Sequence, residues 1–349
     1  YMGASGKPYI KWNAVANASQ YEVYRATTKN GTYTLLGTTT ATHYTDNKAG
    51  SGYTYYYKVK ALAANGAESD YSAVVAGICH CAKPTVKATY MGASGKPYIK
   101  WNTVANASKY EVYRATTKSG TYTLLGTTTA THYTDNKAGS GYTYYYKVRA
   151  ISKVKSTANS VFSVPVAGIC HCAKPTVKAT YMGASGKPYI KWNAVANASK
   201  YEVYRATTKS GTYTLLGTTT ATHYTDNKAG SGYTYYYKVR AISKVKSTAN
   251  SVFSVPVAGI CHCAKPTVKI TTSAGKPKLT WNAVAGASKY YIYRSTEANG
   301  TFEHLYSTKN LFYTNKSAVA GTTYYYKVKA VSKVKSSANS VFSTVVSIR

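Results

Sequence analysis

Short runs of alternating apolar and polar residues recur along the whole chain and predict β-strands. The run Tyr9–Trp12 places Ile10 and Trp12 on one face, and the longest run of the first copy is Tyr55–Ala61. Segments rich in Gly, Asn, Ser and Thr separate the runs and predict turns. Helical periodicity is nearly absent, so the pattern predicts an all-β fold.

This pattern repeats four times. We interpret each copy as one module, because a unit of about ninety residues can bury a single sandwich core. The predicted module boundaries are 1–78, 79–169, 170–260 and 261–349. One core tryptophan marks each copy, with spacings of 89, 91 and 89 residues: Trp12, Trp101, Trp192 and Trp281.

Differences between the copies separate inward from outward positions. In the divergent fourth copy Leu279 stands in place of Ile10 and Ile292 in place of Val23, whereas outward positions change character. The second and third copies are nearly identical, which indicates recent duplication and interchangeable parts. We therefore expect the number of modules to matter more than any single copy.

The combination of a strand tryptophan, Tyr-x-Val-Tyr-Arg and Gly-x-x-Tyr-x-Tyr-x-Val-x-Ala resembles the fibronectin type III fold, as found in tandem on bacterial surface and secreted proteins. The resemblance covers all four copies. It implies four Ig-like β-sandwich modules in an elongated array, each with sheets A-B-E and C-C′-F-G. It also implies a tyrosine corner, in which a hydroxyl bonds back to the turn backbone, at Tyr55, Tyr144, Tyr235 and Tyr324.

The first copy departs from this pattern because it lacks the segment that would form strand A. We expect the chain to be a piece of a longer protein that supplies neighbouring domains. The alternative is that another chain provides the missing edge strand.

The charge balance is strongly basic, with 44 basic against 10 acidic residues and a net charge of +34. Such a surface attracts anionic wall polymers or glycans, or else it only keeps the modules soluble and mutually repelling. Nucleic acid is not expected as a specific partner. No apolar run is long enough to span a membrane, so membrane insertion is not expected.

One predicted strand face interleaves aromatic and basic side chains, an arrangement that suits stacking on sugars and pairing with anionic groups. The alternative is that Tyr and Lys are simply favourable on strand surfaces, which we prefer over a specific site. In the first module the candidate polyanion or glycan face consists of Tyr24, Arg25, Tyr53, Tyr56, Lys58 and Lys60.

All six cysteines lie at the seams between copies, in a repeated Cys-His-Cys motif. In an extended strand both thiols point to one side and are separated by about 6.5 Å between Cα atoms, near the upper limit of disulfide geometry. We favour a strained disulfide that stiffens the joint, and we keep open a metal site and free or intermolecular thiols. The joint residues are Cys79, His80, Cys81, Cys170, His171, Cys172, Cys261, His262 and Cys263.

Catalysis is not expected. Each middle module has only two acids, and the fourth replaces both with Tyr291 and Asn315. Asp46, Asp135 and Asp226 follow Tyr-Thr at a strand end, where an aspartate caps the next turn. No nucleophile, base and orienting group occur together, and no cofactor is expected.

These observations favour a non-enzymatic extracellular stalk or spacer of a bacterial surface or secreted protein, with weak attraction to polyanions. A multivalent glycan-binding adhesin is the second hypothesis. A self-associating extracellular fibre, with metal-binding or cross-linked joints, is the third.

Overall fold

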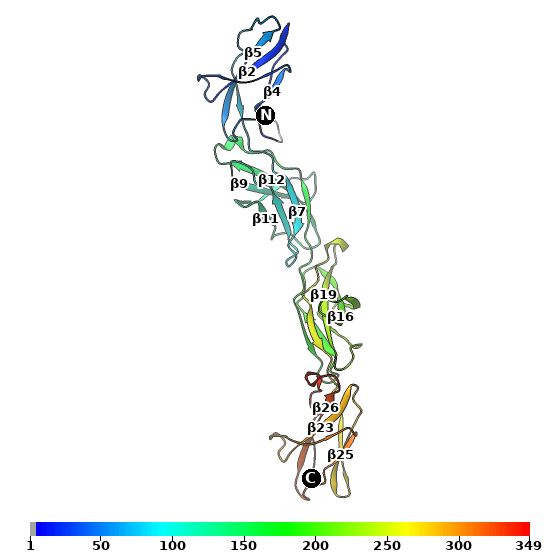
Figure 1. Cartoon of the computed structure of the whole chain (residues 1–349). Helices are drawn as coiled ribbons and strands as arrows, with labels where there is room; N and C mark the ends of the chain where they lie inside the picture. The colour runs from blue at the N-terminus through cyan, green and yellow to red at the C-terminus, as the bar shows by residue number, and fades with distance from the viewer. Residues whose placement is uncertain (1–4) are drawn as a thin grey trace. The chain divides into compact units, whose positions relative to one another are not determined.

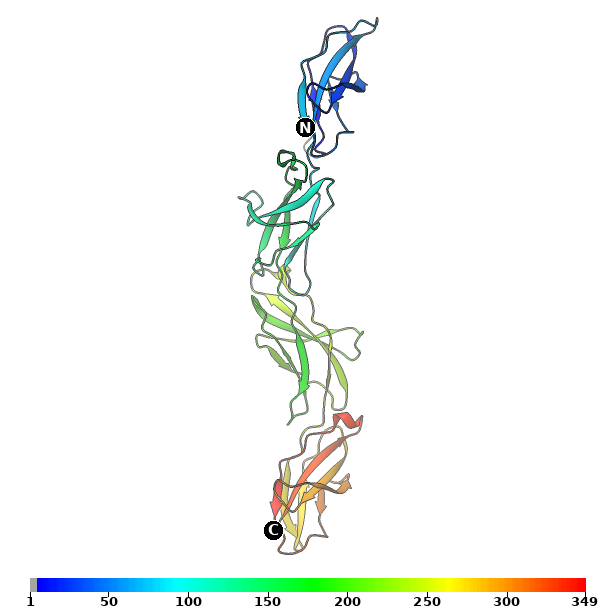
Figure 2. The same cartoon turned by 90° about the vertical axis from the view of Figure 1, so that its left-hand side faces the viewer.

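The structure of the chain is a computed structural model, which describes residues 5–349. Strands dominate it (Figure 1). The described part has three helices, each a 3₁₀ turn of three residues drawn as a short coil in Figure 2: η1 (Ser156–Ala158), η2 (Ser247–Ala249) and η3 (Ser336–Ala338). None of them is long and apolar enough to cross a membrane.

Module 2 shows the full architecture, two antiparallel sheets facing each other. The sheet orders are β7-β8-β11 and β10-β9-β12-β13. The first matches the predicted A-B-E, and the second contains the predicted strands C, C′, F and G, with C′ at the edge and C next to F. The strands are β7 (Val86–Tyr90), β8 (Pro97–Trp101), β9 (Ala107–Ala115), β10 (Thr123–Thr128), β11 (His132–Thr134), β12 (Thr143–Ser152) and β13 (Val166–Ile169).

Modules 3 and 4 repeat this order, so the predicted all-β class with four sandwiches is confirmed. Module 3 contains β14 (Val177–Tyr181), β15 (Pro188–Trp192), β16 (Ala198–Ala206), β17 (Thr214–Thr219), β18 (His223–Thr225), β19 (Thr234–Ser243) and β20 (Val257–Ile260). Module 4 contains β21 (Val268–Ser273), β22 (Lys276–Trp281), β23 (Ala287–Ser295), β24 (Glu303–Thr308), β25 (Phe312–Thr314), β26 (Tyr324–Ser332) and β27 (Val346–Ile348).

Module 1 differs at one edge. Within the described residues β1 pairs with β4 alone, because no strand takes the place of β7. Val15 is consequently 47% exposed, whereas the equivalent Val104 of module 2 is 4% exposed. The strands are β1 (Tyr9–Lys11), β2 (Ala18–Ala26), β3 (Thr34–Thr39), β4 (His43–Thr45), β5 (Thr54–Ala63) and β6 (Val75–Ile78).

Each core forms where the inward positions of the two sheets meet. In module 2 Ile99, Val112 and Val148 are fully buried, and Trp101 packs edge-on against Tyr110 with ring centroids 5.3 Å apart. Trp192 and Trp281 are likewise buried, while Trp12 is half-buried beside the open edge of module 1. The modules group into two compact units, Tyr1–His171 and Cys172–Arg349.

Candidate functional site: the Cys-His-Cys joints

The two cysteines of a joint belong to different modules. Cys79, which the predicted boundary assigned to module 2, is bonded to module 1: its N–H donates to the Tyr53 carbonyl at 2.9 Å, and its own carbonyl accepts from the Gly52 N–H at 2.6 Å. Cys81 begins module 2: its N–H donates to the Ala158 carbonyl of η1 at 2.9 Å, and its side chain lies in the core of that module. Cys263 has the same place in module 4, with its N–H on the Ala338 carbonyl.

The predicted disulfide is wrong: all six cysteines are buried, and none of them forms a disulfide within residues 5–349. The Cys79 thiol points to the Ala49 carbonyl at 3.5 Å, inside module 1. The Cys81 thiol points to the Asn106 carbonyl at 3.8 Å, inside module 2. Because the two sulfurs fill separate sites, a bond between them would pull each out of its own module.

Burial raises the pKa of Cys79 and Cys81, and it does the same for Cys170, Cys261 and Cys263. A thiol with a raised pKa holds little of the nucleophilic thiolate at neutral pH. These cysteines therefore act as small apolar side chains that fill the two ends of a joint.

The histidine of the joint contacts both modules. In the second unit the His262 ring stacks on Tyr181 of module 3, with centroids 3.7 Å apart. Its Nδ1 lies 3.1 Å from the carbonyl of Asn339 in module 4. Because a carbonyl only accepts, this contact assigns the proton to Nδ1. His80 makes the same contact with the Asn159 carbonyl in the first unit, also at 3.1 Å.

The metal-site hypothesis finds no donor cluster. No group of three or more His, Cys, Asp and Glu side chains comes together in residues 5–349. The His80 and His262 rings face backbone carbonyls, and the two sulfurs of the first joint lie in different modules. A zinc site needs several such donors around one point, so the joint geometry does not fit one.

Other contacts at the joint were not predicted from the sequence. Gly52 has φ +95°, and a Cβ added there would lie 2.6 Å from Val154 Cβ of module 2. Gly232 meets Val334 in the same way in the second unit. Asn106 Nδ2 also donates to the Ser51 carbonyl at 3.1 Å. The available signal was the segment Ser-Lys-Val-Lys-Ser, which modules 2, 3 and 4 carry after their longest strand and module 1 lacks.

A tyrosine hydroxyl fixes the turn that precedes the longest strand of every module. Tyr144 Oη accepts a hydrogen bond from the Gly139 N–H at 3.0 Å. Tyr55 and Tyr235 accept equivalent bonds at 3.0 Å, and Tyr324 accepts one at 3.3 Å. The tyrosine that is fully buried stands two residues further on, for example Tyr146.

Two bacterial relatives match part of the chain. Exoglucanase B of Cellulomonas fimi is 29% identical over 264 residues, which are 66% of this chain and 22% of the relative. A poly(3-hydroxybutyrate) depolymerase of Ralstonia pickettii is 32% identical over 151 residues, 43% of this chain and 28% of the relative. The chain thus spans less than a third of the length of either enzyme, and no family model matches it.

Solved structures also match the chain. A Fn3-like protein from Clostridium thermocellum is 31% identical, with 24% of this chain and 88% of that chain covered and a TM-score of 0.23. The FN1-FN3 domains of chicken CNTN1 are 15% identical, with 76% of this chain and 97% of that chain covered and a TM-score of 0.26. The division of the strands between two sheets and the tyrosine-to-turn bonds are those that the resemblance implied. The chain consists of tandem fibronectin type III-like domains.

The candidate face on the first fibronectin type III-like domain is largely engaged in internal contacts. Arg25 does not face a partner outside the domain, because its Nη1 lies 3.0 Å from Oδ2 of the fully buried Asp46. The same carboxylate accepts a hydrogen bond from the Tyr57 hydroxyl at 2.8 Å. Arg25 is therefore part of a buried network rather than of an open cationic surface.

The two lysines of that face are also paired. Lys60 Nζ lies 2.5 Å from a Glu68 carboxylate oxygen. Lys58 Nζ lies 3.5 Å from the centroid of the Tyr71 ring, and Tyr24 packs edge-on against the same ring at 5.2 Å. Only a weak attraction to anions remains for cations with such partners.

The remaining two tyrosines of the face differ in exposure. Tyr53 is 52% exposed, whereas Tyr56 is half-buried within β5. The six side chains thus form no continuous basic and aromatic site in module 1.

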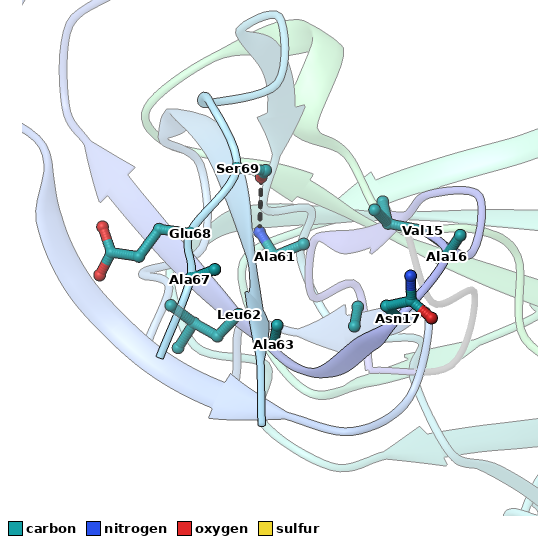
Figure 3. A pocket seen from close by; sticks show the side chains of 10 residues that line it. Val15, Ala16, Asn17, Ala61, Leu62, Ala63, Ala67, Glu68 and Ser69 are labelled. Carbon is teal, nitrogen blue, oxygen red and sulfur yellow. Dashed lines mark hydrogen bonds between the residues drawn. The ribbon is translucent and has the colours of Figure 1, made fainter. Parts of the chain in front are cut away.

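A shallow hollow lies at one end of module 1, at a position that a cysteine side chain fills in module 2. It is lined by Val15, Asn17, Ala61 and Leu62, and Ser69 Oγ accepts a hydrogen bond from the Ala61 N–H beside it (Figure 3). In module 2 the residue equivalent to Asn17 is Asn106, whose carbonyl receives the Cys81 thiol. The second cysteine of a joint therefore closes the end of the domain that follows it.

Proposed function

We propose that this chain is a non-catalytic spacer region of an extracellular bacterial enzyme, built from stiffly joined fibronectin type III-like domains. The relatives support the setting, because both are bacterial enzymes by name and the chain matches less than a third of each. The hydrogen-bonded joints support the role of a stiff spacer, because they limit the flexibility between neighbouring domains.

One observation carries the proposal: the backbone N–H groups of all three residues of the Cys-His-Cys motif are hydrogen-bonded. Three consecutive N–H groups donate within the first unit, Cys79 to Tyr53, His80 to Gly6 and Cys81 to Ala158, at 2.8–2.9 Å. Buried side chains then fix both ends of the joint. Fixing a segment in this way removes the freedom that a Gly- or Ser-rich linker would keep.

The carboxylates support a non-catalytic role. Glu111 lies 2.6 Å from Arg149 Nη2, and the buried Asp135 lies 2.9 Å from Arg114 Nη1. Acids held in this way serve the stability of the sandwich and offer no free pair for acid and base chemistry.

The spacer also attracts anionic polymers weakly. The 44 basic residues outnumber the 10 acidic ones, so many cations have no acidic counterpart. We expect retention of the full chain on an immobilised anionic polymer at 50 mM salt and its release by 500 mM salt, because such attraction depends on counterion release. Retention at the higher salt would point to a specific site instead.

The stiffness of the first joint can be measured by pulsed electron spin resonance on the full chain. Nitroxide-bearing unnatural amino acids replace Lys29 of module 1 and Lys118 of module 2. We expect a narrow distance distribution, and a control with a Gly-Ser insert between Ile78 and Cys79 should broaden it. Equally broad distributions in both proteins would overturn the spacer mechanism.

A further inference from the structure

Module 4 departs from its three neighbours at four positions that lie together. Around strands β24 and β25 it has Tyr306 for a glycine, Phe312 for a histidine, Asn315 for an aspartate and Ser317 for a lysine. In module 2 the equivalent residues are Gly126, His132, Asp135 and Lys137. The spacer role needs none of these changes, since the other modules form the same sandwich without them.

The first two changes create an aromatic surface. At Gly126 of module 2 an added Cβ would lie 2.4 Å from the Tyr133 hydroxyl oxygen, so that module has no room for a side chain. In module 4 Tyr306 instead stacks on Tyr313, with centroids 4.8 Å apart and planes 22° apart. Tyr306 remains 50% exposed and Phe312 is 51% exposed.

The other two changes remove the negatively charged partner of an arginine, Arg294. In modules 1 to 3 the equivalent arginine pairs with a fully buried aspartate at 2.9–3.0 Å. Asn315 carries no charge and donates to the Tyr326 hydroxyl at 2.7 Å. Arg294 Nη1 now donates to Ser317 Oγ at 3.3 Å, and no carboxylate lies within ion-pair distance of Arg294 among residues 5–349.

Three of the four changed residues, Tyr306, Phe312 and Ser317, line one open depression of about 520 Å³. Its walls combine the rings of Tyr306 and Phe312 with the polar groups of Thr308 and Asn310 and the ammonium group of Lys316. Ser317, which holds Arg294, also lines it. Module 4 as a whole has thirteen basic residues and only two acidic ones, Glu297 and Glu303.

We propose that this depression binds a carboxylate-bearing sugar residue of an acidic polysaccharide. The apolar face of a sugar ring packs on the exposed aromatic rings, and its hydroxyl groups bond to Thr308 and Asn310. The carboxylate pairs with Lys316 and with Arg294, whose own buried anion is absent in this module. One spacer domain thereby anchors the chain to its polymer while the other three only extend it.

A single-stranded nucleic acid would also use rings and cations. Such binding, however, relies on successive stacking steps along a strand. The aromatic surface belongs to one module only, and its rim supplies hydroxyl and amide groups that match sugar hydroxyls. The sugar is therefore the better match, and an oligonucleotide serves as the competing ligand in the test.

The test is titration calorimetry of the full chain with a tetrameric oligouronate, its carboxyl-reduced counterpart and a short oligothymidylate at 150 mM salt. We expect a Kd of about 1 mM for the oligouronate and weaker binding of the other two. Tyr306→Gly restores the residue of the other modules and should weaken binding about tenfold. Tyr306→Phe keeps the ring and should bind as the wild type does.

Charge is tested separately. Arg294→Gln should weaken binding of the oligouronate several-fold and leave its carboxyl-reduced counterpart unaffected, whereas Lys200→Gln in module 3 should change neither. Equal binding by wild type and Tyr306→Gly would overturn the site. Equal binding of charged and reduced sugars would overturn the acidic ligand, and preference for the oligonucleotide would overturn the sugar. The stiffness measured across the first joint is independent of all these results.

Discussion

At the scale of single residues, a buried carboxylate organises each of the first three modules. Asp135 is fully buried and accepts hydrogen bonds from the Tyr146 hydroxyl at 2.9 Å and the Lys137 N–H at 3.0 Å. Its negative charge is balanced by Arg114 at 2.9 Å. A buried charge needs such partners, so removal of any one of them leaves the others uncompensated.

Burial and the adjacent carboxylate raise the pKa of Tyr146, and they act likewise on Tyr57 and Tyr237. Because the folded-state pKa lies above the unfolded value of about 10, this stabilisation is complete below pH 10 and is lost as pH rises further. We expect the full chain to lose unfolding free energy between pH 7 and pH 10.5 in urea titrations.

The triple variant Tyr57→Phe, Tyr146→Phe and Tyr237→Phe should be less stable at pH 7, by about 1 kcal/mol per module, because each aspartate loses a donor. It should then lose less on going to pH 10.5. The control replaces the exposed Tyr53, Tyr142 and Tyr233 by Phe and should follow the wild type. An unchanged pH dependence in the first variant would refute the assignment.

The sequence predicted only one of the three roles of this aspartate. Its position after Tyr-Thr indicated a turn cap, and Asp46 does accept the Lys48 N–H at 3.0 Å. The pairing with Arg25 joins residues 21 positions apart, with Arg25 on β2 and Asp46 directly after β4 of the other sheet. The alternation along a strand predicts which side of the sheet a residue faces, but it does not predict which side chain it contacts there. The sequence pattern therefore predicts an outward Arg25 and does not reveal its pairing with Asp46.

At the scale of elements, the segment before a module completes that module. Strand β7 pairs with β8 in register Val86↔Trp101 and Ala88↔Ile99, and Cys81 ahead of it closes the core. In module 1 no strand within residues 5–349 pairs with the corresponding edge of β1, which lies beside a hollow lined by Ile10, Tyr57 and Gly77. An open edge of this kind can receive an added strand.

A synthetic peptide with the sequence of residues 82–90 should therefore bind to module 1 of the full chain. Its Val86 and Ala88 would cover Trp12 and Ile10, which shifts Trp12 fluorescence and raises the unfolding temperature of this module. The control peptide carries Val86→Lys and Ala88→Lys, which put charges into the hollow. Equal changes in Trp12 fluorescence and unfolding temperature with both peptides, or no change with either, would contradict strand addition at this edge.

The same scale explains the error at the joints. An extended Cys-His-Cys does place alternate side chains on opposite sides, which is all that the periodicity contains. Two thiols on the same side of a strand can contact each other or pack into two different domains. The outcome depends on how the ends of the neighbouring domains are placed, which the periodicity does not contain. The ends of modules 1 and 2 meet within the motif, so Cys79 and Cys81 are separated by their domains.

At the scale of the whole molecule, sequence periodicity was enough to predict the fold and the repeat. The same pattern of strands and turns occurs in four copies, so each copy supports the strand assignment of the others. The net charge was less informative about a binding site. Of the ten acidic residues, six form ion pairs within the described part, so the basic excess is spread over many cations. The proposed spacer role depends on the joints, since the number of domains sets the length only if the joints are stiff.

Amide hydrogen exchange of the full chain at the first joint tests this claim most directly. The N–H groups of Cys79, His80 and Cys81 all donate to backbone carbonyls, and both cysteines are buried. We predict that these three amides exchange as slowly as those of the central strands β9 and β12. Exchange within seconds, as expected for the exposed turn residue Asn65, would show a flexible linker and contradict the account.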